Sequence, residues 1–318
     1  MQPDWLSRFL DLVPVQGRLD MRCFYGAPWA TGGGRMPRGE LPYHAILSGQ
    51  AVLETGPSSC RLETGDIVVI ANGEAHQLHD GGGEPADPAR ETQRLNLLIR
   101  ENSGPGERLD MLCGRFTVAA PFDRWMQLYL PPYLVVRTGA GEESAAGQLG
   151  ALVELMRGET VSDTLGGRAM LNALSTAMFT LILRRAAESG DAPRGLLALA
   201  GNPRLGAALA ALFNRPEHPW TLPELADLCG MSRATLARQF QDTLGYSASD
   251  LLTDIRMTLA ARKLENPTLS TGAVGEDVGY QSEAAFQRAF KLHMGITPSA
   301  WRKGMRQPAA PTSAAVEQ

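Results

Sequence analysis

Two stretches of sequence near the carboxyl end decide the fold of this chain. They are Gly230-Met-Ser-Arg-Ala-Thr-Leu-Ala-Arg-Gln-Phe240 and Gly279-Tyr-Gln-Ser-Glu-Ala-Ala-Phe-Gln-Arg-Ala-Phe290. In each, a glycine suited to a left-handed turn precedes a serine that can cap a helix, and two apolar residues four apart follow on the inner face. This order is typical of a helix-turn-helix. The residue types that recur fifty positions later are Ser232 and Ser282, Arg238 and Arg288, Phe240 and Phe290, and Gly245 and Gly295.

The residues around these stretches predict an all-helical domain. Thr221 and Glu224 have the spacing of a capping box, and Thr297 ahead of a proline begins a last helix. Between the two units, apolar residues at helical spacing predict one linking helix. They are Leu251, Leu252, Ile255, Leu259 and Leu264. Two glycines and two acidic residues in 271–277 predict a weak first helix in the second unit.

The outward residues of the second helix in each unit are candidates for binding DNA, because that helix enters the major groove. Segment 215–306 carries 11 Lys and Arg against 10 Asp and Glu, so a plain helical scaffold that binds protein is the alternative. Phosphate contacts are therefore expected from helix N-termini and from local basic residues. These basic residues are Arg233, Arg238, Arg288, Lys291 and Arg302. The other outward positions are Ala234, Thr235, Ala237, Glu283, Ala284 and Gln287.

This segment resembles the DNA-binding domain of AraC-type transcription regulators over roughly a hundred residues. The two stretches above carry the resemblance, with Trp220-Thr-Leu-Pro-Glu-Leu-Ala226 and Phe290-Lys-Leu-His-Met-Gly-Ile-Thr-Pro-Ser-Ala-Trp-Arg-Lys303. It implies two reading helices in successive major-groove segments, about 34 Å apart. At the outward sites of the first reading helix, alanines can offer only methyl contacts to thymine, whereas Arg238 and Arg288 can offer bidentate contacts to guanine or can hold phosphate. The implied base-facing set is Ala234, Ala237, Arg238, Glu283, Ala284, Gln287 and Arg288.

The amino-terminal part of the chain has two further patterns. Up to about residue 137, short apolar runs at 45–47, 51–54 and 67–70 are separated by glycine turns, which indicates a small β-barrel or sandwich. Residues 142–188 repeat apolar side chains at three- and four-residue spacing and predict a helical hairpin. The apolar stripes of this hairpin face either the core or a second copy of the chain.

The segment from Gly39 to His76 resembles the two motifs of a cupin barrel. Residues 65–76 keep the spacing of the second motif, whereas in the first motif His44 remains and Ile46 stands where a second histidine ligand is usual. Because a catalytic cupin usually needs an intact metal triad, we expect no enzyme. The resemblance implies an α+β chain, with an N-terminal cupin-like β-barrel and helical hairpin followed by two helix-turn-helix motifs joined by a linking helix.

Within this family the chain resembles the branch of activators that respond to reactive chlorine. The residues that carry this resemblance are Leu19-Asp-Met-Arg-Cys23-Phe-Tyr-Gly26, Trp29, His44, Gly65-Asp66, His76 and Cys113-Gly114. The resemblance implies that Cys23 and Cys113 respond to oxidants. Oxidation needs thiolate character and access, and a nearby histidine or metal ion supplies the first.

Four residues form a candidate metal site in this region. Cys23, His44, His76 and Cys113 together make a tetrahedral S2N2 set suited to zinc, and another transition metal is an alternative. His79 is an alternative to His76, on the expectation that both face one side of a strand. Four unrelated residues are the simpler interpretation, since a free cysteine is usually an inert core residue. The other cysteines are Cys60, expected as a bystander in a hairpin loop, and Cys229, expected in the core.

The favoured function is a sequence-specific transcription regulator whose cupin domain senses an oxidant. A small organic ligand in the cupin pocket is the alternative trigger, and a metal-dependent cupin enzyme is the second alternative. The aromatic residues that could line such a pocket are Trp29, Tyr43, Trp125 and Tyr129. We expect promoter DNA and RNA polymerase as partners, and a homodimer stays open. We expect the signal to pass through a long helix over 168–185.

Composition limits these alternatives. The 318 residues have a net charge of −4, with 44% hydrophobic and 20% charged residues, which excludes wholesale disorder and a polybasic nucleic-acid binder. Neither a run of about twenty apolar residues nor a signal-peptide pattern is present. We therefore expect a cytoplasmic protein with reduced thiols and no membrane partner. The expected divisions are 1–190 for the sensor, 191–204 for a linker, 205–306 for the DNA-binding domain and 307–318 for a disordered tail.

Overall fold

The computed structural model describes residues 4–139, 144–189 and 194–306. The chain divides into two compact bodies. The first consists of Phe9–Gly206 with Asp242–Leu244, and the second consists of Met1–Arg8, Ala207–Gln241 and Gly245–Gln318. None of the helices in the described ranges has the length and apolar character needed to cross a membrane.

Two β-sheets make up most of the first compact body. In the described residues the larger sheet has seven strands in the order β11-β6-β3-β10-β1-β9-β8, and the smaller has four in the order β2-β7-β4-β5. The predicted strands at 45–47, 51–54 and 67–70 are confirmed as parts of β3, β4 and β6. The strands are β1 (Val15–Gly26), β2 (Ala30–Gly33), β3 (Glu40–Ser48), β4 (Gln50–Thr55), β5 (Ser58–Glu63), β6 (Asp66–Ile70), β7 (His76–His79), β8 (Arg90–Gln93), β9 (Leu98–Glu101), β10 (Arg108–Val118) and β11 (Tyr133–Arg137).

An apolar core lies between the two sheets. Side chains alternate between the faces of a strand, so each strand sends every second residue into this core. The core includes Cys23, Tyr25, Trp29, Ile46, Leu53, Leu62, Val68, Ile70, Leu78, Met111 and Cys113. Both cysteines of the predicted sensor therefore belong to the wall of the core.

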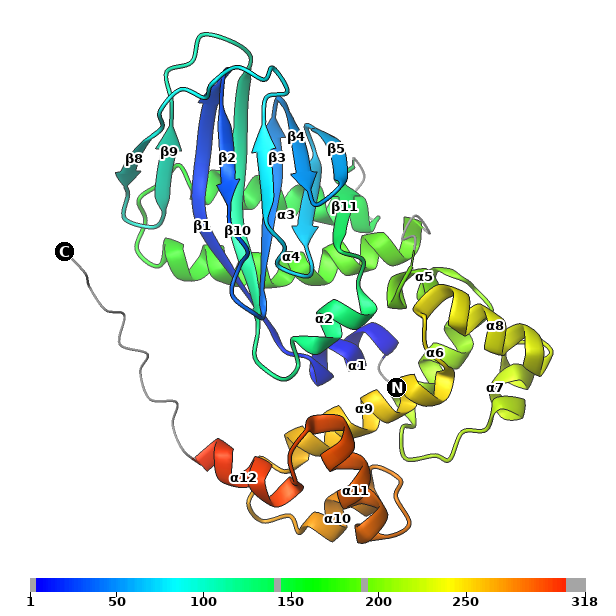
Figure 1. Ribbon diagram of the computed structural model, residues 1–318. Coiled ribbons are helices and arrows are strands. Elements are labelled where there is room, and N and C mark those ends of the chain that lie inside the picture. Colours follow the sequence, from blue (N-terminus) through cyan, green and yellow to red (C-terminus); the bar gives the residue numbers. More distant parts are fainter. Residues whose placement is uncertain (1–3, 140–143, 190–193, 307–318) are drawn as a thin grey trace. The chain divides into compact units, whose positions relative to one another are not determined.

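Helices α3 (Ala145–Glu159) and α4 (Gly167–Ser189) form the predicted hairpin behind the large sheet (Figure 1). Helix α4 packs against β1. It comes so close at Gly17 that a Cβ atom there would lie 2.4 Å from the α4 backbone. Most of the predicted apolar stripe is core, because the residues that are buried are Leu149, Val153, Met156, Leu171, Met178 and Ile182.

Among the described residues, three short helices were not predicted. Helices α1 (Trp5–Leu12) and α2 (Arg124–Tyr129) fall within a region that has the pattern of strands, and both are too short for a clear helical period. Helix α5 (Leu196–Gly201) lies within the expected linker. It forms there because its three leucines are buried in the core. Residues 191–193 of the expected linker lie outside the described residues, and so does the expected disordered tail, 307–318.

The carboxyl-terminal part is helical throughout, as predicted. Helix α9 links one helix-turn-helix, formed by α7 and α8, to a second, formed by α10 and α11 (Figure 1). The helices are α6 (Leu205–Asn214), α7 (Leu222–Leu228), α8 (Arg233–Leu244), α9 (Ala248–Lys263), α10 (Thr271–Asp277), α11 (Glu283–Met294) and α12 (Pro298–Arg306).

The predicted turns and caps define both helix-turn-helix units. Gly230 and Gly279 have φ angles of 60° and 89°, which glycine adopts without steric cost. The Ser232 and Ser282 side chains each accept a hydrogen bond from the backbone N–H three residues on. Helix α10, expected to be weak, is formed and is capped by Ser270.

Glycine allows α10 to cross α11 closely, and this contact is testable. A Cβ atom at Gly275 would lie 2.9 Å from the Cβ atom of Phe286, so we expect Gly275→Ala to lower the free energy of unfolding by about 1–3 kcal/mol. Gly272→Ala in the same helix is the control. Its new methyl group meets the flexible end of Glu283, so it is expected to be neutral or stabilising by up to about 1 kcal/mol. Urea unfolding of the full chain, followed by circular dichroism, measures both, and equal effects would contradict the packing argument.

Candidate functional site

The first reading helix, α8, presents its polar residues away from the core. Leu236 and Phe240 are fully buried and fix the inner face. The N-cap Ser232 hydroxyl lies 2.9 Å from the Thr235 hydroxyl, which leaves Thr235 only half-exposed. The residues of this helix that are exposed as predicted are Arg233, Ala234, Ala237 and Arg238.

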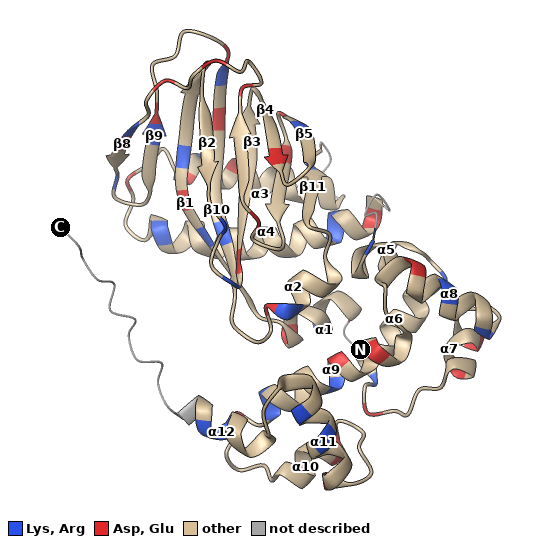
Figure 2. Ribbon diagram, viewed as in Figure 1, with Lys and Arg blue, Asp and Glu red and all other residues tan. Residues whose placement is uncertain are grey.

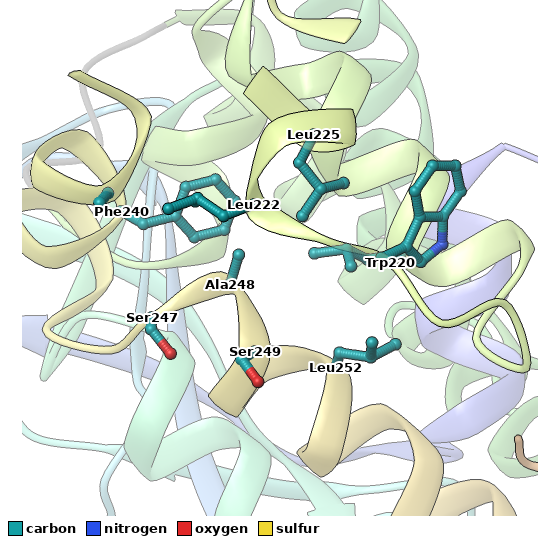
Figure 3. A pocket seen from close by; sticks show the side chains of 10 residues that line it. Trp220, Leu222, Leu225, Phe240, Ser247, Ala248, Ser249 and Leu252 are labelled. Carbon is teal, nitrogen blue, oxygen red and sulfur yellow. The ribbon is translucent and has the colours of Figure 1, made fainter. Parts of the chain in front are cut away.

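An apolar cavity of about 180 Å³ lies beside α8 (Figure 3). Its walls include Trp220, Leu225, Phe240 and Leu252, which come from the loop before α7 and from α7, α8 and α9. Ala237 also lines it. This alanine therefore lies at the border between the exposed face of α8 and the cavity, whereas Ala234 belongs to the exposed face alone.

The second reading helix, α11, repeats this arrangement. Phe286 and Phe290 are buried, and the predicted outward residues are exposed; they are Glu283, Ala284, Gln287 and Arg288. The Gln287 amide donates to the Glu283 carboxylate at 2.9 Å, so the two side chains present one joined polar surface.

Both reading helices contain basic residues (Figure 2). Among the described residues, Arg238 and Arg288 have no acidic partner, and Lys291 is exposed. Arg302 differs from the expectation of a phosphate contact, because its guanidinium donates to the backbone carbonyls of Leu264 and Leu269. We therefore assign Arg302 to the packing of α12.

The two predicted sensor cysteines lie on neighbouring strands, β1 and β10. In the antiparallel register Cys23 is opposite Met111 and Cys113 is opposite Met21, so the cysteines are diagonal neighbours on one face of the sheet. Their sulfur atoms are 3.7 Å apart. His44 on β3 is directly opposite Cys113, and its Nδ1 lies 3.2 Å from the Cys113 sulfur.

The predicted metal set forms a line of contacts rather than a ring. The Nε2 atom of His44 lies 2.9 Å from the Nε2 atom of His76, which comes from the smaller sheet. Cys113 thus contacts one ring nitrogen of His44 and His76 contacts the other, and one ion can bind only one of these nitrogens. Within the described ranges, no group of three or more His, Cys, Asp and Glu is placed to hold a metal ion. The arrangement does not fit a four-ligand ion, and metal binding stays a prediction.

Burial and mutual contact set the ionisation of this cluster. The hydrogen bond from the Cys113 thiol lowers the pKa of Cys23, and the same contact followed by burial raises the pKa of Cys113. Burial, with a smaller effect from His76, lowers the pKa of His44 to about 3. Burial also lowers the pKa of His76. Cys23 is therefore the thiol that ionises first, beside two neutral imidazoles.

Tyr25 is a neighbour of the thiols that was not predicted. It lies two residues beyond Cys23 on the same face of β1 and is buried, and its hydroxyl helps to lower the pKa of Cys23. The period of two along a strand was the available signal. Tyr25 stacks on Trp29 with ring centroids 5.3 Å apart.

The cluster reaches the surface at His76. This histidine lines an open polar pocket of about 380 Å³, together with Gly32, Gly33, Glu54 and Gln77. The Nδ1 atom of His76 lies 3.3 Å from the carbonyl oxygen of Glu74. The side chain of His76 therefore separates the open pocket from His44 and the two sulfur atoms.

Two predictions about neighbouring residues were wrong. His79 does not replace His76, because the two are three residues apart on β7 and face opposite ways; its Nε2 atom pairs with Glu54 at 3.4 Å. Cys60 lies in strand β5, opposite Leu53, and not in a hairpin loop. Cys229 is buried as expected.

The aromatic residues expected around a ligand are packed as core. Trp29 stacks on Tyr25. Tyr43 stacks on Phe116 and its hydroxyl lies 2.8 Å from that of Ser175 on α4. Trp125 and Tyr129 pack on each other within α2. They occupy three separate packing contacts, so we do not assign them to one pocket.

Comparison with known proteins identifies both parts of the chain. A cupin family model matches residues 4–188 and a helix-turn-helix domain model matches residues 225–304. A putative AraC-like transcription regulator of Streptomyces antibioticus is 32% identical over 94% of this chain and 98% of its own. The Escherichia coli protein described as RCS-specific HTH-type transcriptional activator RclR is 29% identical over 96% of this chain and 99% of its own. The AdpA DNA-binding domain, solved with a target DNA, is 29% identical over 33% of this chain and 93% of that chain, with a TM-score of 0.31.

The neutral buried histidine predicts an acid-sensitive sensor domain. Burial lowers the pKa of His44 from 6.5 to about 3. Above pH 6.5 this histidine is neutral in both the folded and the unfolded chain. As the pH falls from 6.5 toward 3, only the unfolded chain takes up the proton, so the free energy of unfolding decreases. At pH 5 the loss relative to pH 7 is about 2 kcal/mol. Unfolding of the full chain in chelator across this range measures it. His44→Gln should flatten the pH dependence, and an unchanged slope would refute this assignment.

Proposed function

This chain belongs to the AraC-type transcription regulators, with an N-terminal cupin domain and a C-terminal helix-turn-helix DNA-binding domain, and we propose that its cupin domain senses an oxidant through Cys23 and Cys113. The observation that carries the proposal is the 3.7 Å approach of the two sulfur atoms, with His44 beside Cys113. A relative described as RCS-specific matches nearly the whole chain, and the residues that resemble the reactive-chlorine branch include both cysteines.

Hypochlorous acid would convert this pair to a disulfide in two steps. The Cys23 thiol loses its proton and the thiolate attacks the chlorine of HOCl; a sulfur–chlorine bond forms as the chlorine–oxygen bond breaks, and the departing hydroxide takes up that proton and becomes water. The Cys113 sulfur then displaces chloride from Cys23 and forms the disulfide, while the Cys113 proton passes to His44 Nδ1, 3.2 Å away. The two thiols lose two electrons and the oxidant is reduced to chloride and water.

Closing the disulfide requires the strands to move. A disulfide bond is about 2 Å long, whereas the sulfur atoms are 3.7 Å apart on diagonal positions. The β1–β10 register shifts between Leu19 and Met21, and such an irregularity interrupts the ladder and bends the strand at this point. Farther along β1, the Gly17 N–H donates to the Thr176 hydroxyl of α4 at 2.8 Å. We therefore propose that oxidation shifts β1 and that α4, which contains residues 168–185, receives the shift.

The same proposal assigns DNA reading to α8 and α11. Arg238 and Arg288 are exposed and lack an acidic partner among the described residues, so each can contact guanine or phosphate. Promoter DNA is the proposed partner, with RNA polymerase, and a homodimer joined through the exposed side of the hairpin stays a prediction. The proposed domains are 1–190 and 205–306.

The two alternatives make different demands. A small-ligand sensor would respond to its ligand under reducing conditions, and the aromatic residues expected to line its pocket are packed as core. A cupin enzyme would need a bound metal, and the relatives reported above are named regulators. Catalytic turnover by iron-loaded protein would support the enzyme alternative.

Substitution of the cysteines tests the sensor. One equivalent of hypochlorous acid should form one internal disulfide in the natural chain and in the control Cys60→Ser, and a thiol reductant should reverse it. Cys23→Ser and Cys113→Ser should not form this bond. Mass spectrometry of the digested full chain maps the disulfide, and a DNA shift assay follows the response. A normal response of DNA binding in both variants would refute the sensor.

Substitution of the arginines tests the reader. Arg238→Ala and Arg288→Ala should each weaken binding to a duplex selected by the natural chain, by about 1–3 kcal/mol for a guanine contact. Arg61→Ala, on β5, is the control and should bind as the natural chain does. Fluorescence anisotropy with labelled DNA measures the affinities. If neither reader variant differs from the control, the helical-scaffold alternative is correct.

A further inference from the structure

We propose that Arg256 on the linking helix α9 is a positioning residue that sets the spacing at which the two helix-turn-helix units read DNA. The inference rests on the proposed reading by α8 and α11. Arg256 contacts DNA-reading residues of neither unit. It joins the loop that leads into the first unit to the turn of the second.

The contact with the first unit consists of three backbone carbonyls. The Arg256 Nε donates to the carbonyl of Pro216 at 2.6 Å. The Nη2 donates to the carbonyls of His218, at 2.9 Å, and Glu217, at 3.3 Å. These carbonyls are consecutive, so one guanidinium fixes the path of the whole loop between α6 and α7.

That loop is in turn fixed to the start of α7. The Trp220 indole N–H donates to the Arg215 carbonyl at 3.0 Å, and the His218 and Trp220 rings have centroids 4.4 Å apart. The His218 Nε2 lies 3.4 Å from the Glu224 carboxylate. Glu224 forms the capping box of α7 together with Thr221. A shift of the loop would therefore move the first helix of the first unit.

The contact with the second unit is made at its turn. The Arg256 guanidinium lies 5.8 Å from the centroid of the Tyr280 ring, within the range of a cation–π contact. Next to it, a Cβ atom at Gly279 would lie 2.4 Å from the Glu217 carbonyl oxygen and 2.8 Å from Arg256 Nη2. The turn between α10 and α11 thus touches the loop ahead of α7, with Arg256 between them.

The turn is coupled to the second reading helix. The Tyr280 N–H donates to the Gly275 carbonyl of α10 at 2.9 Å, and the Tyr280 ring lies 5.8 Å from that of Phe286 on α11. The contact network therefore runs from the cap of α7 through one guanidinium to the core of α11. Only arginine combines a planar set of donors for several carbonyls with a face that can stack on an aromatic ring.

The burial of Arg256 strengthens this network. Arg256 is half-buried, and burial lowers its pKa from the usual range, yet arginine stays charged at neutral pH. Carbonyls left without this donor would lose charge-assisted hydrogen bonds. Without Arg256 the two units would be held mainly by packing on α9, and their relative rotation would be less restricted.

DNA provides a sensitive measure of that restriction. One inserted base pair rotates one half-site by about 34° around the helix axis relative to the other. A rigid pair of units should reject this insertion, and a loosely joined pair should tolerate it. The predicted signature is a change in spacing preference, which a general loss of stability would not produce.

The experiment uses the full reduced chain. A two-box duplex is selected with the natural chain from a random library, and affinities are then measured for that duplex and for versions with one base pair added or removed between the boxes. The natural chain should prefer the selected spacing by about tenfold or more, and Arg256→Gln should reduce this preference at least about threefold. Arg256→Lys, which keeps the charge but not the fork, should lie between them.

Arg302→Gln is the matched control. Arg302 also donates to backbone carbonyls, those of Leu264 and Leu269, but these lie at the C-terminal end of α9 and in the segment before α10, and not in the loop ahead of α7. It should weaken binding to all spacings alike and keep the natural preference. If Arg256→Gln fails to fold by circular dichroism, Arg256→Lys decides the question, with a reduced preference supporting the inference.

Two outcomes would overturn the inference, and they are distinguishable. If folded Arg256 variants keep the natural spacing preference, Arg256 does not position the units, while the proposed reading of DNA stands. If the natural chain selects a single box and ignores the second, two-helix reading itself fails, and the positioning role of Arg256 fails with it.

Discussion

The antiparallel pairing of β1 with β10 determines where every group of the sensor lies. This pairing puts Cys23 and Cys113 on diagonal positions of one face, and the pairing of β10 with β3 puts His44 directly opposite Cys113. The other end of β1 packs on α4 at Gly17. One strand therefore contains the attacking thiol and also contacts the helix that we propose to receive the signal. In the proposed mechanism, the backbone of β1 is the path by which the redox state of the two sulfur atoms would affect the position of α4.

Local chemistry explains why much of the helical part could be predicted from sequence. A hydroxyl cap, a glycine with positive φ and apolar residues four apart act within a few residues of one another, so Gly230, Ser232 and Phe240 identify their unit without its tertiary context. The first cupin motif likewise retained His44, which the structure places against Cys113. These features need no long-range contact to be recognised.

The wrong and missed predictions depend on contacts that no local pattern records. Cys60 belongs to a strand because β5 pairs with β4, and the adjacent glycine turn gave no sign of that pairing. Whether four ligating residues surround a point or form a line depends on the orientation of the His44 ring between two sheets. Arg256 lies in an ordinary helical pattern, and its three carbonyl partners are about forty residues earlier in the chain. Such residues become visible only in three dimensions.

Burial of the thiol pair limits the oxidants to which the proposed sensor could respond. Cys23 has no exposed surface and Cys113 has 9%, so a bulky disulfide cannot approach in line with either sulfur, as thiol–disulfide exchange requires. A small neutral oxidant pays no large desolvation penalty, and the open pocket that His76 lines is the side on which the cluster comes nearest to solvent. The imidazole of His44, with its pKa lowered to about 3, is too weak a base to ionise Cys113 in the resting protein. In the proposed mechanism, proton transfer from Cys113 becomes favourable only when its sulfur attacks an oxidised Cys23, so the second step would follow the first.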